Sequence, residues 1–259
     1  MLKYKNIRFA GLILLCLTGF QPLAESRSVL TAYSPAHRVA MLELYTSEGC
    51  SSCPPADRFM RELRRAEVSE LRMIPLAFHV TYWDKLGWSD RFADKRFDDR
   101  QRMQVRLGES RTVYTPQYML NGRDFRDYKS LYIDINRTNQ QAAPYQLKLS
   151  VVPDTDSIAV GLDVTSVKQD DGTAVAYIAM YEHDLGSDVT EGENEGEQLK
   201  HDYVVRDLKG PFPIDNAQAT ITAEFTTTDY KINDTGIVAF VQRSRAPDIL
   251  QVVRLELEQ

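Results

Sequence analysis

The sequence predicts an α/β domain followed by an all-β domain built as an antiparallel sandwich. Three observations lead to this prediction. Between residues 39 and 143, short apolar runs alternate with amphipathic segments of helical period. After Pro144, short β-prone runs follow one another, separated by clusters of Pro, Gly, Asp and Asn. Ahead of both, residues 1–24 have the organisation of a secretory leader.

The leader is predicted to be a cleaved signal peptide. Lys3, Lys5 and Arg8 form a basic start, and an apolar run follows over residues 9–20. This run is too short to span a bilayer comfortably, and we expect cleavage after Ala24. The mature protein would then be periplasmic or secreted, with an uncleaved N-terminal anchor as the alternative. A polar lead-in over residues 25–38 is expected to follow.

The first domain, residues 39–143, is expected to alternate strands and helices. Strands are predicted over residues 39–45, 71–80 and 117–120, and helices over residues 56–68, 91–107 and 128–141. Pro75 favours an edge or a bulge, because proline cannot donate a ladder hydrogen bond. Residues 81–112 form a mainly helical insertion that ends near Gly108. The pair Asn121-Gly122 predicts a hairpin turn into a strand that begins at Phe125.

The second domain, residues 144–259, is expected to be a β-sandwich. Seven strands are predicted over residues 145–152, 157–167, 174–182, 199–207, 217–227, 236–242 and 249–257. Their regular spacing and the turn residues between them are typical of an antiparallel sandwich. Residues 186–196 are rich in acidic side chains and are expected to form a surface loop.

The charge balance disfavours some classes of partner. The formal net charge is −6, and leader cleavage would make it −9, because it removes three basic residues and no acidic one. An acidic chain argues against nucleic acid and against anionic membrane surfaces. No second apolar segment is long enough to span a bilayer, so no membrane contact is expected after cleavage.

Cys50 and Cys53 are the most informative residues. A strand-like run leads directly into Cys50-Ser51-Ser52-Cys53, and a helical segment follows. Two thiols at a helix N-terminus lie where the helix dipole and free N–H groups stabilise a thiolate. A thiolate with a second thiol in reach is the minimum for thiol–disulfide exchange. A static disulfide is the alternative, whereas a zinc knuckle lacks its second cysteine pair.

The two thiols are expected to differ. Cys50 lies at the turn, where N–H groups converge, so we expect it to be the more exposed, more acidic, attacking thiol. Cys53 would then resolve the mixed disulfide. Pro54-Pro55 delays the helix start, and the Ser-Ser dipeptide carries no charge, so the pKa of Cys50 is expected to fall only modestly.

The order strand, Cys-x-x-Cys, helix, strand, inserted helix, Thr-Pro, strand, turn, strand, helix resembles the thioredoxin fold. A bacterial family of secreted thioredoxin-like proteins, catalogued only as a domain of unknown function, is similar over residues 42–57, 78–88, 111–117 and 121–122. Its second-domain signature resembles residues 192–196, His201 and residues 204–206. The resemblance spans residues 39–255 and implies a thioredoxin-like first domain. It implies no substrate, because the family has none established.

The resemblance also implies roles for single residues. Pro116 would follow a cis peptide bond opposite the cysteines and expose the backbone of Thr115 to an extended substrate. Thioredoxins carry a buried acid six residues before the first cysteine, whereas Glu43 lies seven residues before Cys50. A buried carboxylate with a raised pKa and a solvated edge residue are both open for Glu43.

Two further side chains are candidates for supporting roles. His79 ends the second predicted strand and could supply a proton or a metal ligand beside the thiols, with a structural histidine as the alternative. Trp83 lies in the aromatic stretch that follows, where packing is the common role of tryptophan. His201, far away in the second domain, is expected to be structural.

Together these features predict an extracytoplasmic thiol–disulfide oxidoreductase. Its partners would be protein thiols and disulfides and a redox partner, and no cofactor or resident metal is expected. One alternative is a periplasmic copper-binding or delivery protein, in which Cys50, Cys53 and His79 hold copper(I). The other is a non-enzymatic adaptor with a structural disulfide.

Overall fold

The computed structural model describes residues 28–65, 73–108, 112–167, 173–227 and 230–257. These residues form fourteen strands, three α-helices and two 3-10 helices, so the described chain is mostly β. Within it, no helix is long and apolar enough to cross a bilayer. The expected leader and the expected helix end and strand start at Val68 and Leu71 lie outside the described residues.

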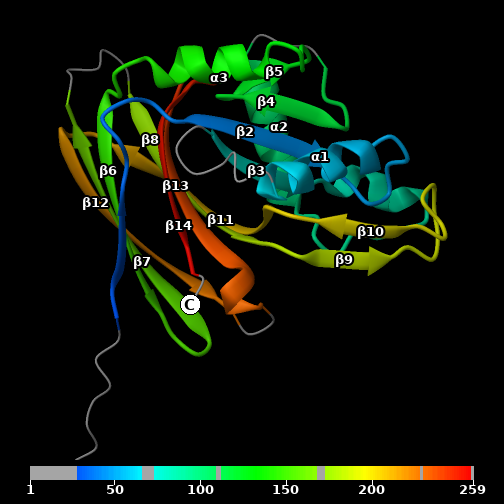
Figure 1. The fold of residues 1–259 in the computed structure, drawn as a ribbon. Coiled ribbons are helices and arrows are strands. Elements are labelled where there is room, and N and C mark those ends of the chain that lie inside the picture. Colours follow the sequence, from blue (N-terminus) through cyan, green and yellow to red (C-terminus); the bar gives the residue numbers. More distant parts are fainter. Residues whose placement is uncertain (1–27, 66–72, 109–111, 168–172, 228–229, 258–259) are drawn as a thin grey trace, which may run out of the picture.

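Most strands belong to one eight-stranded sheet (Figure 1). Its order is β14-β13-β8-β11-β3-β2-β4-β5. The bounds of these strands are Ala40–Thr46 (β2), Met73–His79 (β3), Gln117–Leu120 (β4), Arg123–Phe125 (β5), Ala174–Glu182 (β8), Val204–Ile214 (β11), Thr235–Arg243 (β13) and Ile249–Glu256 (β14). The sheet therefore combines strands from both halves of the chain.

The two halves join where β3 meets β11. Val204 pairs in parallel with Ala77, whose N–H donates to the carbonyl of Tyr203 at 2.8 Å. On its other side β3 runs parallel to β2 along its whole length. Pro75 precedes the contact with β11, so its missing N–H does not interrupt that junction.

The expectation of an α/β thioredoxin-like N-terminal domain beside a separate all-β sandwich is wrong. The N-terminal strands do not form a sheet of their own, because β3 offers its free edge to β11 and the ladder continues through β8, β13 and β14. Pairing of an open strand edge satisfies backbone groups that would otherwise need another cover. The chain is a strand-rich protein with one sheet running through both halves.

A second, four-stranded sheet covers part of the first. Its order is β1-β6-β7-β12, and its strands are Leu30–Tyr33, Tyr145–Pro153, Ser157–Ser166 and Gln218–Thr226. Apolar side chains of β6, β7 and β12 share one buried cluster with those of β8, β13 and β14. Strand β1 lies within the expected lead-in and pairs antiparallel with β6.

Strand β8 is buried on both faces, which explains its nearly continuous apolar sequence. Tyr177 and Tyr181 face the cluster that includes the helices, while Ile178 and Met180 face the four-stranded sheet. This alternation follows the two-residue period of a strand.

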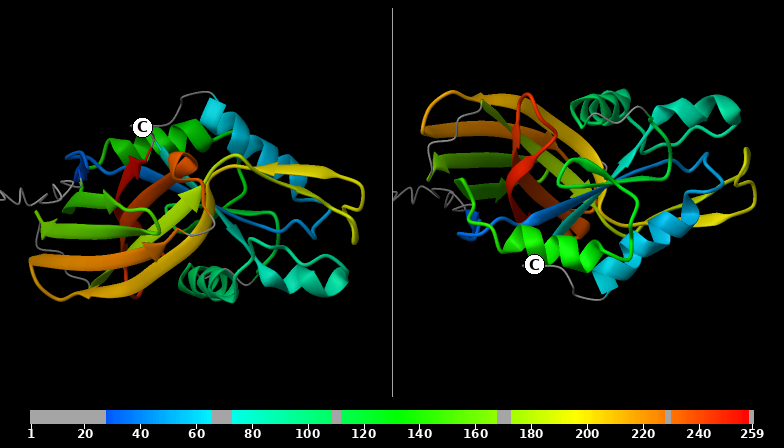
Figure 2. Two further views of the ribbon diagram at one scale, coloured as in Figure 1. Left: turned by 90° about the horizontal axis from the view of Figure 1, so that it is seen from below. Right: turned by 90° about the horizontal axis from the view of Figure 1, so that it is seen from above.

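Three helices cover the β2–β4 part of the large sheet. Helices α1 (Pro54–Arg65) and α3 (Leu131–Asn139) lie on one face, and α2 (Lys95–Leu107) lies on the other with the 3-10 helix η1 (Thr81–Leu86) (Figure 2). Helix α2 ends at Gly108, as predicted. A short 3-10 helix, η2 (Ile232–Asp234), precedes β13.

A hairpin from the second half of the chain reaches back to α1. It consists of β9 (Leu185–Asp188) and β10 (Gln198–His201), and β10 contacts α1 (Figure 1). The sequence predicted one strand over residues 199–207. The strand is interrupted near Tyr203, where φ is +59°, so two strands, β10 and β11, stand in its place. The expected acidic surface loop is therefore partly strand β9 and the connection to β10.

Candidate functional site

The cysteine pair lies between the end of β2 and the start of α1. Cys50 and Cys53 form a disulfide. The carbonyl of Cys53 accepts hydrogen bonds from the N–H groups of Ala56 at 2.8 Å and Asp57 at 3.2 Å, so the helix begins directly at the second cysteine. Pro54 occupies the first helical position, where the absence of an N–H costs nothing.

Both cysteines are fully buried, so the expectation that Cys50 is the more exposed one is wrong. Only Ser51 and Ser52 are exposed at the turn. Two distant segments contact the loop that carries them. Thr115 contacts the sulfur of Cys50, and the connection between β9 and β10 binds the carbonyls of Glu48 and Cys50 and the side chain of Ser51.

Thr115 contacts the sulfur of Cys50 directly. Its Oγ1 lies 3.3 Å from Sγ of Cys50 as a donor and accepts a hydrogen bond from Nε1 of Trp83 at 2.7 Å. Because the indole occupies a lone pair of Oγ1, the hydroxyl proton is directed to the sulfur. The Thr115–Pro116 peptide bond is cis, as predicted. The structure thus brings five predicted site residues together: Cys50, Cys53, Thr115, Pro116 and Trp83.

Glu43 is buried, and its polar partners are Tyr45 and Arg100, not the sulfurs. It accepts a hydrogen bond from Tyr45 at 3.1 Å and forms an ion pair with Arg100, whose Nη2 lies 2.7 Å from Oε1. Burial acts to lower the pKa of Arg100, but the attraction of Glu43 raises it above its ordinary value. Glu43 thus serves as the counter-charge of the buried Arg100 guanidinium.

His79 is fully buried beneath the cysteine loop and belongs to a cluster of ionisable groups. Its Nδ1 lies 2.7 Å from Oδ2 of Asp90, and its ring packs edge-to-face against His201 with centroids 4.9 Å apart. Nε2 of His201 lies 3.0 Å from Oε1 of Glu48, and Nδ1 lies 3.9 Å from Oδ2 of Asp57. The expectation that His201 is remote from the site is therefore wrong.

The electrostatics of this cluster favour charged carboxylates. Burial acts to raise the pKa of Asp90 and of Glu48, but His79 and His201, respectively, lower both below their usual values. Burial acts to lower the pKa of His201, but Asp57 and Glu48 raise it to about 10. Trp88 also donates to Glu48, at 2.9 Å.

The connection between β9 and β10 holds the cysteine loop from outside. Oε2 of Glu193 accepts hydrogen bonds from the N–H of Ser51 at 3.1 Å and from its hydroxyl at 2.7 Å. Nδ2 of Asn194 donates to the carbonyls of Glu48 at 2.7 Å and Cys50 at 3.0 Å. The serine hydrogen bonds lower the pKa of the exposed Glu193. We call residues 189–197 the cap.

Loss of the cap contacts should make the disulfide easier to reduce. Asn194→Ala removes two hydrogen bonds of about 1 kcal/mol each, so opening of the cysteine loop should become about 30-fold more frequent. The rate of disulfide reduction by excess dithiothreitol, followed by alkylation and mass spectrometry, measures this. Glu195→Ala, an exposed change in the same cap, is the matched control. Equal rates for Asn194→Ala and the unmodified chain would show that the cap does not limit access.

An apolar groove of about 340 Å³ opens beside the cysteine turn. It is lined by Ser52, Pro55, Ala56, Phe59, Pro116, Tyr118, Tyr128, Leu131 and Tyr132. Tyr128 and Tyr132 are more than half exposed, so the groove offers aromatic surface to solvent. Ser52, whose Oγ lies 3.3 Å from Sγ of Cys50, lines the groove together with Pro116, so the groove lies next to the buried disulfide.

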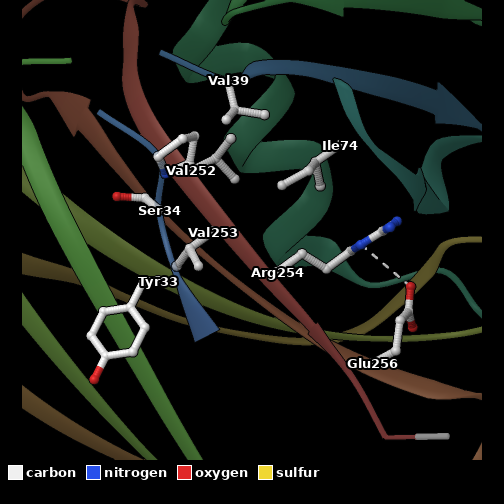
Figure 3. A pocket seen from close by; sticks show the side chains of 9 residues that line it. Tyr33, Ser34, Val39, Ile74, Val252, Val253, Arg254 and Glu256 are labelled. Atoms are coloured by element: carbon white, nitrogen blue, oxygen red, sulfur yellow. Dashed lines mark ion pairs between the residues drawn. The ribbon is translucent and has the colours of Figure 1, made fainter. Parts of the chain in front are cut away.

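A second cavity, of about 330 Å³, has no connection to this chemistry (Figure 3). It lies between the segment around Tyr33 and strand β14, where Arg254 and Glu256 form an ion pair at 3.4 Å. None of the site residues predicted from the sequence lines it.

Sequence reasoning gave no site role to Glu193, Asn194 and His201. Residues 192–196 and His201 belong to the family signature, and the acidic composition of residues 186–196 predicts a solvated loop. The available signal was their occurrence in that signature together with the cysteine motif. Only the hairpin geometry shows that they contact the cysteine loop.

Two solved structures are similar to this chain in fold. A protein of Agrobacterium tumefaciens whose X-ray crystal structure is known is 25% identical, with a TM-score of 0.65 over 86% of this chain and 96% of that chain. HBP35 of Porphyromonas gingivalis is 13% identical, with a TM-score of 0.65 over 86% of this chain and 76% of that chain, and shows the fold alone. The comparison with curated proteins gives no match.

A family profile described as "Protein of unknown function (DUF1223)" matches residues 41–242. The chain belongs to the DUF1223 family. The DUF1223 match includes the cysteine loop, Thr115 and the cap, so it spans both halves of the candidate site. The resemblance to a family of unknown function is thereby confirmed, and it carries no activity with it.

Proposed function

We propose that this DUF1223 protein is an extracytoplasmic thiol–disulfide oxidoreductase that acts on protein thiols and disulfides. The observation that carries the proposal is the contact of the Thr115 hydroxyl with the sulfur of Cys50 at the border of an apolar groove. The basic and apolar organisation of residues 1–24 supports export.

The surroundings of Cys50 suit a thiolate once the disulfide is reduced. A hydrogen bond donated to a charged sulfur favours the charged form and lowers the pKa of the thiol. Thr115 offers such a donor, and Oγ of Ser52 lies 3.3 Å from the same sulfur. The adjacent groove would hold an apolar, extended stretch of the substrate protein against Pro116.

The exchange step is balanced by two thiol–disulfide transfers. The Cys50 thiolate attacks a substrate disulfide, forms a mixed disulfide and releases one substrate thiolate. The Cys53 thiolate then attacks Sγ of Cys50, which releases the second substrate thiol and forms the Cys50–Cys53 disulfide. Two electrons pass to the substrate, and a dithiol partner protein returns them. The same steps in reverse oxidise a substrate dithiol.

Single-cysteine variants test this activity. In the reduced chain, Cys53→Ser should accumulate a mixed disulfide at Cys50 with a disulfide-bonded peptide that carries aromatic residues, because the resolving thiol is missing. Cys50→Ser is the matched control and should trap nothing. Intact-mass measurement identifies the adduct. If neither variant forms an adduct while the unmodified chain leaves the peptide oxidised, the disulfide is structural and the adaptor alternative replaces the enzyme.

The role of Thr115 has its own test. Thr115→Val keeps the side-chain volume but removes the donor, so the pKa of Cys50 in the reduced chain should rise by about one unit, or about 1.4 kcal/mol. The pH dependence of iodoacetamide labelling measures this pKa. Trp83→Phe, which removes the hydrogen bond to Thr115 together with part of the ring that packs on the core, should shift it less and in the same direction. An unchanged pKa in Thr115→Val would remove the hydroxyl from the mechanism.

A further inference from the structure

We propose that Asp57, His79 and His201 form a buried binding site for a divalent transition-metal ion, with zinc as the best match. The site lies behind the cysteine loop and is separate from thiol exchange. It also differs from the copper site expected from the cysteines and His79, because it uses no sulfur.

The three side chains come from three distant elements. Asp57 lies in α1, His79 ends β3 and His201 ends β10. One ligand atom of each lies within 4.8 Å of the other two, and all three residues are buried. Two imidazole nitrogens and a carboxylate oxygen are a ligand set that zinc takes in proteins.

Two of these atoms have no other partner. Among the described residues, Nε2 of His79 and Nδ1 of His201 are buried nitrogens without a hydrogen bond. A buried polar atom without a partner costs free energy, and such atoms in native proteins call for an explanation. A metal ion bound by both nitrogens would supply that explanation.

The opposite nitrogen of each ring is held by a carboxylate. Asp90 holds Nδ1 of His79 at 2.7 Å, and Glu48 holds Nε2 of His201 at 3.0 Å. A carboxylate hydrogen-bonded to one ring nitrogen orients the ring so that the other nitrogen can face a metal, which is the usual arrangement around histidine ligands. Both histidines of the cluster have it.

His183 provides a contrast for His79. This histidine is also buried, but carboxylates face both of its nitrogens: Asp202 lies 3.1 Å from Nδ1 and Glu256 lies 3.9 Å from Nε2. His201 has carboxylates at nearly the same distances, 3.0 Å and 3.9 Å, but the more distant one is Asp57, itself a member of the proposed ligand set. Within the part of the chain that the structure describes, the unpartnered Nε2 of His79 has no such carboxylate outside the site.

Metal binding requires the three side chains to move closer together. Around a tetrahedral zinc ion with bonds of about 2.1 Å, ligand atoms are about 3.4 Å apart, which is shorter than the 4.8 Å limit that encloses them here. Closure would tie α1, β3 and β10 to one ion. It would thereby hold the hairpin and its cap against the base of the cysteine loop.

The experiment is a titration of the chelator-treated, oxidised chain with Zn²⁺, against a competing chromophoric indicator. We expect one Zn²⁺ per chain and affinity reduced at least about 100-fold in His201→Gln and in Asp57→Asn. Glu48→Gln, which alters only the carboxylate behind His201, should weaken binding about 10–100-fold. His183→Gln is the matched control and should bind like the unmodified chain. Absence of stoichiometric binding, or equal losses in His183→Gln and His201→Gln, would overturn the site.

Two further measurements separate this site from the thiols and from misfolding. X-ray absorption of the zinc-loaded, unmodified chain should show nitrogen and oxygen ligands only, and sulfur ligands would refute the assignment. The Cys50→Ser/Cys53→Ser double variant should retain zinc affinity while losing exchange, so failure of one proposal leaves the other measurable. Loss of zinc affinity in that double variant, with its circular dichroism unchanged, would assign the metal to the cysteines.

Discussion

Replacing Arg100 with methionine is expected to lower the free energy of unfolding by about 3–5 kcal/mol, because it leaves the Glu43 carboxylate buried without its counter-charge. The guanidinium is almost fully buried and also donates to Glu43 through Nε at 2.8 Å. It lies 5.0 Å from the ring centroid of Tyr177 and 4.9 Å from that of Phe240. Urea denaturation followed by circular dichroism measures the change.

Arg102→Met is the matched control on the same helix. Arg102 is partly exposed. It pairs with the exposed Asp99 at 3.3 Å and lies 3.6 Å from the buried Asp98, which also accepts hydrogen bonds from Thr81, so the loss of Arg102 should cost less than about 1 kcal/mol. The Glu43→Met/Arg100→Met double variant removes both charges and should recover much of the stability. Additive losses in the double variant would mean that the pair is not coupled.

Gly122→Ala is expected to cost about 3 kcal/mol or more. Gly122 has φ of +85°, where an alanine pays about 1–2 kcal/mol in the left-handed region. In addition, a Cβ atom there would lie 1.8 Å from the carbonyl oxygen of Pro247, so the backbone would have to shift, at roughly 1–3 kcal/mol. The hairpin between β4 and β5 would be displaced from the loop before β14. Chemical denaturation again provides the measurement.

Two other glycines separate the two causes. Gly196 has φ of +86° but nothing within 4 Å of a new Cβ atom, so Gly196→Ala should show the backbone cost alone, about 1–2 kcal/mol. Gly161 lies in β7 with an ordinary φ, and its nearest neighbour is Ser150 at 3.9 Å, so Gly161→Ala should change stability by less than about 1 kcal/mol. Similar losses at Gly122 and Gly196 would rule out the clash with Pro247.

The ion pair with Arg100 defines the role of Glu43. Its position before the cysteines left open a buried carboxylate or a solvated edge residue, and the structure shows that Glu43 is buried. Strand β2 is flanked by β3 and β4, so Glu43 has no edge at which to meet water. Its charge is compensated by an arginine 57 positions further along the chain. That pairing depends on how α2 lies across the sheet, which residue spacing near Glu43 does not encode.

The sequence by itself determined the elements whose causes are local. Alternating apolar residues predicted most strands of the second half, and Asn121-Gly122 predicted the β4–β5 hairpin, where both residues have positive φ. The cysteine spacing placed Cys50 and Cys53 at a helix start, and Thr115 was identified as their neighbour through the family resemblance. These features depend on periodicity, turn chemistry and short chain distances.

Only the tertiary structure decided that one sheet runs through both halves and that a hairpin from the second half caps the cysteine loop. The β3–β11 junction is made by backbone groups of Ala77 and Tyr203, which every residue carries and which leave no mark in the sequence. Once that junction forms, β10 is directed along α1, and Asn194 and His201 arrive beside residues some 144 and 153 positions earlier in the chain. The burial of both sulfurs and the convergence of Asp57, His79 and His201 follow from this long-range pairing.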